Sequence, residues 1–276
     1  MNGALEPRFD TMSPVDDAGY AFFQRKVLRL TGIDLSAYKS QQMRRRLGTL
    51  LSRNRVTNVL EYSKLLDQPA KLQEFLDFFT INVSEFFRIP EKFQYLEKQV
   101  LPELLRRGGR EVRVWSAGCS NGAEPYSMAM ILDEIAPLGR WSVLATDVDR
   151  TTLARAQRGD KYTPADLRNV GDRRLAKYFE PETAGSYRVK DSLKKRVHFK
   201  VHDLLRDPFE SGFQLILCRH VVIYFTEEAK DTLYKKFSDS LEEGGVLFVG
   251  GTEIIPRARD VGLESMSVSF YRKVSQ

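Results

Sequence analysis

The hydrophobic period of the chain changes near residue 110, and this change limits most strongly how the sequence can fold. Before it, apolar residues recur at helical spacing from Gly19 to about Phe79, without strand alternation. After it, short apolar segments typical of strands alternate with helical segments. Strands that alternate with helices predict a parallel sheet covered on both faces. We therefore predict an α/β fold in the domain formed by residues 81–276 and a separate, all-α N-terminal domain at 1–80.

Three apolar stripes predict the helices of the first domain. The first ends at Thr31-Gly32, a typical helix stop, and the last begins at Pro69, which favours the first turn of a helix. The stripes are Phe23, Val27 and Leu30, then Met43, Leu47, Leu50 and Leu51, then Leu72, Phe75, Leu76 and Phe79.

The second domain has five strand candidates and one interruption. Tyr187–Lys190 and Val197–Lys200 alternate around Gly185, which predicts a small antiparallel insertion at about 178–200. Ser267–Val274 alternates and is short, as expected of an edge strand. The five candidates are 112–116, 141–145, 197–201, 213–218 and 246–249.

The segment Val112–Ser127, VRVWSAGCSNGAEPYS, places a strand, a turn with two glycines and a helix start in succession. Such a turn is the usual nucleotide cradle of an open α/β sheet. A dinucleotide fingerprint is spaced G-x-G-x-x-G, whereas Gly118 and Gly122 are spaced G-x-x-x-G. Glu124, in the first helical turn, favours a ligand with an ammonium group, and Asp147, at the next strand end, can accept hydrogen bonds from ribose hydroxyls. Together these residues favour S-adenosylmethionine over other nucleotides.

Four motifs resemble the CheR family of chemoreceptor glutamate methyltransferases: TINVSEFFR at 80–88, VWSAGCSNGAEPYS at 114–127, LATDVD at 144–149 and LCRHVVIYF at 217–225. The resemblance extends over nearly the whole chain. It implies a Rossmann-like class I methyltransferase domain with a small antiparallel β-subdomain, preceded by a small all-α domain. It also implies methyl transfer from S-adenosylmethionine to glutamate side chains of methyl-accepting chemotaxis receptors, which leaves S-adenosylhomocysteine as the second product.

The resemblance also implies roles for single residues. Glu124 corresponds to the acid that faces the methionine amine, and Asp147 to the acid on the ribose. The family usually has asparagine where this chain has Asp203 and His220; an ionised Asp203 accepts hydrogen bonds but donates none, and His220 is bulkier than an amide. The full set of implied cofactor contacts is Asn82, Ser84, Arg88, Gly118, Glu124, Asp147, Asp203, Leu204, His220 and Val221.

Methyl transfer from a sulfonium to a carboxylate is a direct displacement. A glutamate with a pKa of about 4.3 is already ionised at pH 7, so no general base is required. We expect catalysis to depend on holding the carboxylate oxygen against the methyl group. Arg88 is the candidate for cationic positioning of a carboxylate. Tyr224, just after a strand end, is a second catalytic candidate, and a core position is its alternative interpretation.

Two other functions are alternatives at this point. A nucleic-acid methyltransferase could use the basic helical domain as its binding surface. Against it, Arg219-His220-Val221-Val222 stands where adenine amino-methyltransferases carry a D/N-P-P-Y-type motif. The other alternative is a non-catalytic adaptor that binds S-adenosylmethionine, with Asp203 and His220 as signs of lost activity.

Basic residues are concentrated in the range 25–55, which holds nine Lys and Arg against one acid. This range therefore has a net charge of +8, although the whole chain has a net charge of only +6. A basic patch of this kind attracts nucleic acid, an anionic membrane or an acidic protein. A solvated face is the usual interpretation of a charged helix, but the concentration of charge in this range weakens it here. In the helix predicted over 39–55, Arg46 and Arg53 lie opposite the apolar stripe, with Arg45 at the edge of that face. We predict that these three arginines dock the helical bundle of the receptor.

Several classes are excluded. The longest apolar runs are five residues, whereas a membrane span needs roughly 18, and the start MNGALEPRFD does not have the pattern of a signal peptide. Cys119 and Cys218 are too few for a disulfide framework. His198 and His202 are too far apart along a strand to share a metal, so we predict no metal site. We expect a cytoplasmic monomer with no nucleic-acid partner.

Overall fold

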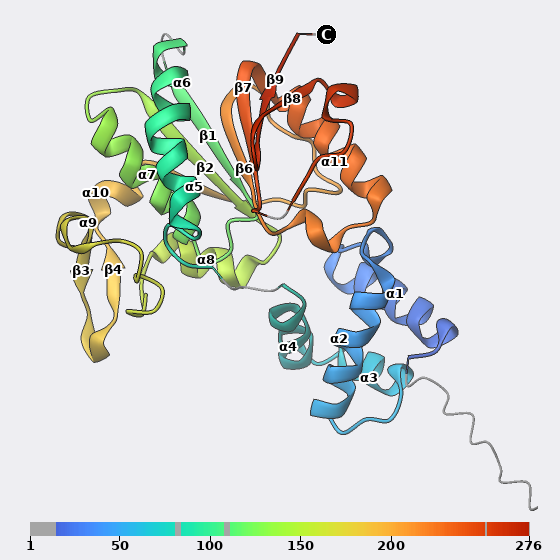
Figure 1. Cartoon of the computed structure of the whole chain (residues 1–276). Helices are drawn as coiled ribbons and strands as arrows, with labels where there is room; N and C mark the ends of the chain where they lie inside the picture. The colour runs from blue at the N-terminus through green and yellow to red at the C-terminus, as the bar shows by residue number, and fades with distance from the viewer. Residues whose placement is uncertain (1–14, 81–83, 108–110, 252, 276) are drawn as a thin grey trace, which may run out of the picture. The chain divides into compact units, whose positions relative to one another are not determined.

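The computed structural model describes residues 15–80, 84–107, 111–251 and 253–275. Contacts between residues divide the chain into two compact units, Met1–Thr80 and Ile81–Gln276. Figure 1 shows the helices and strands of both. None of the helices within the described ranges combines the length and the apolar character that crossing a membrane requires.

The first unit is helical. Gly32, with φ of 81°, ends the first helix in the left-handed conformation, and Pro69 opens the last one, as predicted. Phe23 lies at the centre of the core, with its ring edge-on to Phe75 at 5.3 Å and tilted against Tyr62 at 6.3 Å. The elements are α1 (Asp17–Thr31), η1 (Leu35–Ala37), α2 (Ser40–Arg53), α3 (Val59–Leu65) and α4 (Pro69–Phe79).

The second unit contains a seven-stranded sheet in the order β5-β2-β1-β6-β7-β9-β8. The first five strands in this order run parallel to one another, whereas β9 is antiparallel to both β7 and β8. This confirms the predicted α/β fold. The strands are β1 (Val112–Ala117), β2 (Trp141–Asp147), β5 (Val197–Val201), β6 (Phe213–Cys218), β7 (Leu241–Val249), β8 (Leu263–Ser267) and β9 (Phe270–Lys273).

Helices cover both faces of this sheet, because successive residues of each strand point to opposite sides. On one face, Val112 and Val114 of β1 share a core with residues of α6 and α7. On the other face, Trp115 packs against Phe237 of α11 at 5.5 Å. The helices are α5 (Pro90–Tyr95), η2 (Leu96–Val100), α6 (Leu101–Arg107), α7 (Ala123–Ile135), α8 (Arg150–Arg158), α9 (Asp172–Tyr178), α10 (Asp191–Lys194), α11 (Glu227–Ser240), and the short η3 (Thr183–Gly185), η4 (Val222–Tyr224) and η5 (Ala258–Val261).

Trp115 is the centre of a dense aromatic cluster on the α11 face. Its indole is 1% exposed and donates a hydrogen bond to the hydroxyl of Thr146 at 2.9 Å. His202 and Phe209 both lie edge-on to it, at 5.6 and 4.8 Å between ring centres. The cluster therefore connects β1 to the loop that follows β5.

Two strand predictions are wrong in detail. The antiparallel pair is β3 (Phe179–Pro181) with β4 (Tyr187–Val189), whereas Val197–Val201 is β5 and pairs parallel to β2 in the main sheet. The final strand is not at the edge: β9 lies between β7 and β8, and the edge strand is Leu263–Ser267. That segment is mostly polar and has only one buried residue, so its sequence lacks strand alternation.

The glycine turn between β1 and α7 requires both of its glycines. Gly118 and Gly122 have φ of 82° and 85°, where side chains with a Cβ are strained. A Cβ at Gly118 would lie 2.5 Å from Cγ2 of Val221, and one at Gly122 would lie 3.0 Å from Cβ of Ala156. The turn thus brings its backbone close to the segment after β6.

We predict that Gly118→Ala lowers the free energy of unfolding by about 2–4 kcal/mol, because the left-handed backbone and the collision with Val221 both cost energy. Gly185→Ala is the matched control: its φ is 73°, but an added Cβ meets nothing within 4 Å among the described residues. The control should lose only the backbone part, about 1 kcal/mol. Urea unfolding curves measure both values. Equal losses in the two variants would show that the turn tolerates a side chain.

Candidate functional site

The candidate site lies where the parallel strands end. β1 pairs with β2 on one side and with β6 on the other, so the chain leaves β1 and β6 toward opposite halves of the sheet. In open α/β sheets, ligands bind in the crevice that this reversal opens at the carboxyl ends of the strands. Predicted residues follow these ends: Gly118 follows β1, Asp147 ends β2, the pair 203–204 follows β5, and the pair 220–221 follows β6.

Asp147 is tied to the glycine turn. Its side chain is buried, and its two carboxylate oxygens accept hydrogen bonds from the backbone N–H of Ser120 at 2.8 Å and of Asp149 at 3.0 Å. Burial raises the pKa of this carboxyl, and the two N–H donors oppose that rise. The aspartate therefore sits at the base of the turn, with its charge stabilised mainly by backbone dipoles.

Glu124 has a partner that the sequence did not predict. Its oxygens accept hydrogen bonds from the Ser116 hydroxyl at 2.8 Å and from Nη1 of Arg219 at 3.3 Å. Burial raises the pKa of Glu124, and the charge of Arg219 is the largest effect that lowers it. The carboxylate is thus stabilised by a buried cation as well as by a hydroxyl.

The segment before α5 lies against the glycine turn and α7. The carbonyl of Ser84 accepts a hydrogen bond from the Asn121 side chain at 3.2 Å, and Phe87 N–H donates to the Ser127 hydroxyl at 3.0 Å. The carbonyl of Arg88 accepts from Nη2 of Arg219 at 2.7 Å. The structure therefore brings Ser84 and Arg88 to the site, whereas Asn82 lies outside the described residues.

The backbone on both sides of Arg88 is strained. Phe87 has φ of 52° and Ile89 has φ of 63°, although neither is glycine. A left-handed conformation is a genuine outlier for a β-branched residue such as Ile89. Such strain persists only where surrounding contacts enforce it, and it concentrates at functional sites.

The pair Asp203-Leu204 lies in a loop held by a half-buried lysine. Asp203 accepts a hydrogen bond from Leu205 N–H at 2.9 Å, and the side chain of Leu204 is buried. Nζ of Lys236 donates to the carbonyls of Leu204 at 3.1 Å and of Asp207 at 3.2 Å. Burial lowers the pKa of Lys236. The aspartate thus uses one oxygen to shape its own loop.

His220 follows β6 in a left-handed conformation, with φ of 60°. Burial, together with the charges of Arg88 and Arg219, lowers its pKa to about 4, so the ring is neutral at pH 7. Its Nε2 is buried and finds no hydrogen-bond partner among the described residues. Its backbone N–H and that of Gly250 both bond to the carboxylate of Glu253. Val221, the next residue, packs against Gly118 of the glycine turn. Tyr224 is the last residue of η4, and its side chain is half-buried.

Sequence reasoning missed two buried charges at this edge, Arg219 and Glu253. Each lies one to four residues beyond a buried strand, and a charge in that place was the only signal available. Cys119 and Cys218 are buried nearby, and burial raises the pKa of both thiols, so neither has the character of a nucleophile. The buried carboxylates of Glu124 and Asp147, together with the unpartnered Nε2 of His220, fit a ligand that carries an ammonium group, hydroxyls and a polar ring.

The predicted docking arginines belong to the other unit. The apolar stripe of α2 is buried, as predicted. Arg46 and Arg53 both place their guanidinium groups over the ring of Phe78, at 4.5 and 4.9 Å. Arg45 and Arg53 are exposed, whereas Arg46 is half-buried.

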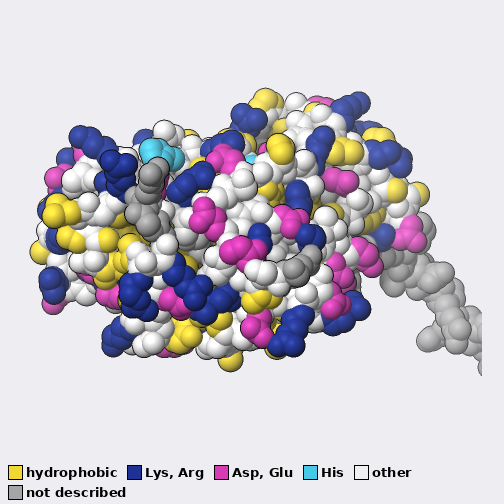
Figure 2. Space-filling view, turned by 90° about the horizontal axis from the view of Figure 1, so that it is seen from above, with side chains coloured by type: hydrophobic (Ala, Val, Ile, Leu, Met, Phe, Trp, Pro, Cys, Tyr) yellow, Lys and Arg dark blue, Asp and Glu magenta, His cyan; other side chains and the backbone are white. Residues whose placement is uncertain are grey.

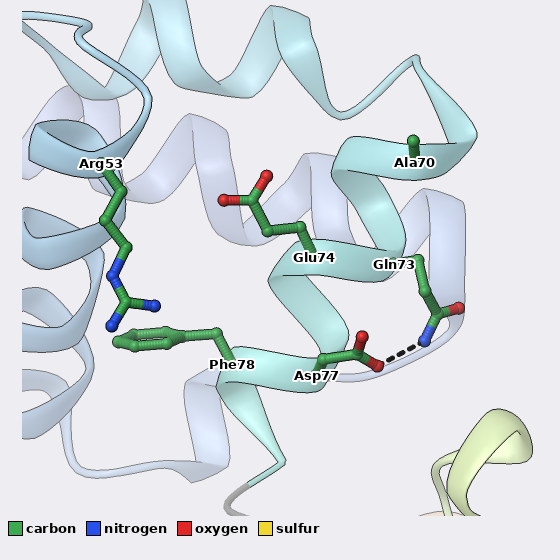
Figure 3. Close-up of a pocket in the computed structure, with 6 residues that line it drawn as sticks. All are labelled: Arg53, Ala70, Gln73, Glu74, Asp77 and Phe78. Carbon is green, nitrogen blue, oxygen red and sulfur yellow. Dashed lines mark hydrogen bonds between the residues drawn. The ribbon is translucent and has the colours of Figure 1, made fainter.

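A hollow of about 510 Å³ lies between Arg53 of α2 and residues of α4 (Figure 3). Arg53, Glu74, Asp77 and Phe78 line it, and Gln73 bonds to Asp77 at 2.7 Å across its rim. Basic and acidic side chains also alternate over the face of the molecule seen in Figure 2. In the hollow, Arg53 has two acidic neighbours, Glu74 and Asp77.

Family models match both units of the chain. Residues 18–80 match the family model described as CheR methyltransferase, all-alpha domain, and residues 82–270 match CheR methyltransferase, SAM binding domain. The solved structure of the glycopeptide N-methyltransferase MtfA complexed with sinefungin aligns with 55% of this chain and 48% of its own, at 15% identity and a TM-score of 0.35.

Similar proteins cover nearly the full length. A chemotaxis protein methyltransferase of Listeria monocytogenes is 41% identical over 95% of this chain and all of its own. Chemotaxis protein methyltransferase 1 of Pseudomonas aeruginosa is 32% identical over 88% of this chain and 93% of its own, and the Escherichia coli protein of the same description is 32% identical over 87% and 85%. The chain therefore belongs to the CheR methyltransferase family, with an all-α domain followed by a methyltransferase domain that binds S-adenosylmethionine.

Proposed function

We propose that this protein methylates glutamate side chains of chemotaxis receptors and converts them to methyl esters. The observation that carries the proposal is the strained segment around Arg88, whose carbonyl is held by the same buried arginine, Arg219, that pairs with Glu124. A cation fixed in that place suits a reaction in which a carboxylate must be brought to a methyl donor. Each transfer would remove one negative charge from the receptor, a local change that can bias a signalling equilibrium.

The proposed roles follow from the chemistry of each group. Glu124 would bind the ammonium group of the methionine part, and Asp147 would accept hydrogen bonds from the ribose. The pairs 203–204 and 220–221 would line the remainder of the cofactor site, with Gly118 allowing close approach of the backbone. The bound cofactor supplies an electrophilic methyl group. Ser84 and Asn82 complete the proposed contacts.

Positioning is the main catalytic requirement in this proposal. The acceptor glutamate is ionised at neutral pH, so the enzyme has no proton to remove. Arg88 would hold a carboxylate by charge and by its fork of N–H donors, and Tyr224 would steer the acceptor oxygen. Orienting the reacting atoms and excluding water account for the rate in such displacements.

The arginines of α2 support a docking role for the first unit. Arg45 and Arg53 are exposed, and Phe78 fixes the guanidinium groups of Arg46 and Arg53 on one ring. Stacking on an aromatic ring reduces the freedom that each cation loses on binding an acid. The proposed partner surface is the acidic helical bundle of the receptor.

The proposed reaction predicts base-labile methyl groups on the receptor. Purified protein, labelled S-adenosylmethionine and the helical part of a methyl-accepting receptor should give label that mild alkali releases as methanol, because esters hydrolyse and methylamines do not. Replacing the acceptor glutamates by alanine should abolish incorporation, and added nucleic acid should leave it unchanged. Label in the nucleic acid would favour a nucleic-acid methyltransferase, and tight cofactor binding without any transfer would favour an adaptor.

Asp147→Ala should weaken S-adenosylmethionine binding at least tenfold, about 1.4 kcal/mol, because it removes the proposed ribose acceptor. Asp149→Ala is the matched control: this neighbouring carboxylate accepts hydrogen bonds from Thr151 and Thr152 and caps α8. The control should lose about 1 kcal/mol of stability but no affinity. Calorimetric titration and thermal melting separate the two effects. Unchanged affinity in Asp147→Ala would remove this residue from the cofactor site.

Arg46→Glu combined with Arg53→Glu should reduce receptor methylation at least tenfold at low salt, since both changes place acids against the proposed acidic partner. Higher salt should slow the wild type for the same reason. Lys98→Glu with Arg173→Glu makes the same charge change at exposed positions of the other unit and serves as the control. Affinity for S-adenosylmethionine should stay the same in both. A double reversal that methylates receptor at the wild-type rate would exclude this docking surface.

A further inference from the structure

Arg219 is a buried cation placed between two groups of the candidate site. Its side chain is 2% exposed, and its guanidinium lies over the rings of Phe93 at 5.1 Å and Phe248 at 4.5 Å. Burial lowers its pKa. Burying a charge costs free energy that packing alone does not offset. The hydrogen-bond partners of this arginine therefore indicate its role.

Those partners lie on two different elements. Nη1 donates to Oε2 of Glu124, in the first turn of α7, and Nη2 donates to the carbonyl of Arg88, in the segment before α5. Its Nε is buried without a hydrogen-bond partner among the described residues. A planar guanidinium fixes the angle between its two donors, so one side chain sets the relative position of Glu124 and Arg88.

The contact to Arg88 falls at the most strained point of the site. Residues 87 and 89 both have left-handed backbones, and the carbonyl that Arg219 holds lies between them. Without that bond, the backbone gains by relaxing toward ordinary φ values, and the direction of the Arg88 side chain changes with it.

We propose that Arg219 is a positioning residue for methyl transfer, which fixes Arg88 and Glu124 relative to each other and does not itself touch substrate. The proposal rests on the roles proposed above for those two residues. In this proposal, the two donors of the Arg219 guanidinium connect Glu124, which binds the cofactor, with Arg88, which orients the acceptor carboxylate.

Loss of Arg219 has a distinct consequence for Glu124. The groups that face this carboxylate are Arg219, Arg88, the Ser116 hydroxyl and the thiols of Cys119 and Cys218. Arg219 gives the largest opposition to the rise in pKa that burial causes. Without it, the pKa of Glu124 rises further, and the carboxylate is ionised, and able to bind an ammonium group, only at higher pH.

Two variants separate the functions of the fork. Arg219→Met removes both contacts, so S-adenosylmethionine should bind at least tenfold more weakly at pH 7, and its affinity should fall more steeply than that of the wild type between pH 7.5 and 6, a range in which the ammonium group of the ligand stays charged. Arg219→Lys keeps a cation near Glu124 but loses the fork. Its affinity should stay within threefold of wild type, while kcat for receptor methylation falls at least tenfold without a matching change in KM for the cofactor.

Arg272→Met is the matched control. Arg272 is a half-buried arginine paired with a carboxylate, that of Glu103, and its Nε, like that of Arg219, is buried without a hydrogen-bond partner among the described residues. Its loss should lower the melting temperature and leave cofactor affinity, kcat and their pH dependence unchanged. Calorimetric titration from pH 6 to 9, receptor methylation kinetics and thermal melting provide the readouts.

The result that overturns the inference is a merely structural phenotype. In that case Arg219→Met melts earlier, as Arg272→Met does, but keeps affinity and kcat within threefold of wild type at every pH. Glu124→Gln distinguishes the levels of failure. If it leaves cofactor affinity unchanged, the proposed role of Glu124 fails and the inference fails with it. If it weakens binding but Arg219→Met does not, only the inference fails.

Discussion

The parallel pairing of β1 on both of its edges is the constraint on which the second unit depends. Because β2 and β6 both run parallel to β1, every chain segment that leaves these strands emerges at the same end of the sheet. Loops from sequence positions more than a hundred residues apart thereby become neighbours. The glycines of the first turn then decide how close these loops can come, since a side chain at Gly118 would displace Val221.

The price of this arrangement is a set of charges that water cannot reach. Glu124, Arg219 and Glu253 are all buried at one end of the sheet, and burial disfavours the charged form of each. In most protein cores, such charged groups are absent or are paired with a charge of opposite sign. Here the ionic groups instead bond to loop backbones, of Arg88 in one case and of His220 and Gly250 in the other. The charges therefore help to fix the shape of these loops.

Much of this architecture could be predicted because its causes are local. Hydrophobic period predicts the helices of the first unit and the buried strands of the second, and Gly32 and Pro69 define helix ends through their own backbone preferences. The predicted hairpin lies too far along the chain, because it includes the residues of β5. As an edge strand of the main sheet, β5 has Val197 buried and His198 exposed, and a hairpin strand shows the same alternation. Likewise, β8 is polar along most of its length and has no strand signature.

The site was only partly predictable for a different reason. Asp147 and Glu124 follow a strand and a glycine turn at fixed spacing, so a local pattern identifies them. Arg219 pairs with a residue 95 positions away, and no local pattern specifies that pairing. The same holds for Glu253, whose partners include the backbone N–H of His220.

Trp115 gives the molecule an internal optical reporter. The chain has two tryptophans, Trp115 and Trp141, and both are buried in the second unit. Indole emission therefore follows the unfolding of the methyltransferase domain and is blind to that of the helical domain, whose loss of structure appears in circular dichroism. Because Phe209 and His202 lie edge-on to Trp115, the same emission also senses rearrangement of the loop between β5 and β6. Two spectroscopic signals can thus assign each melting transition to its own half of the chain.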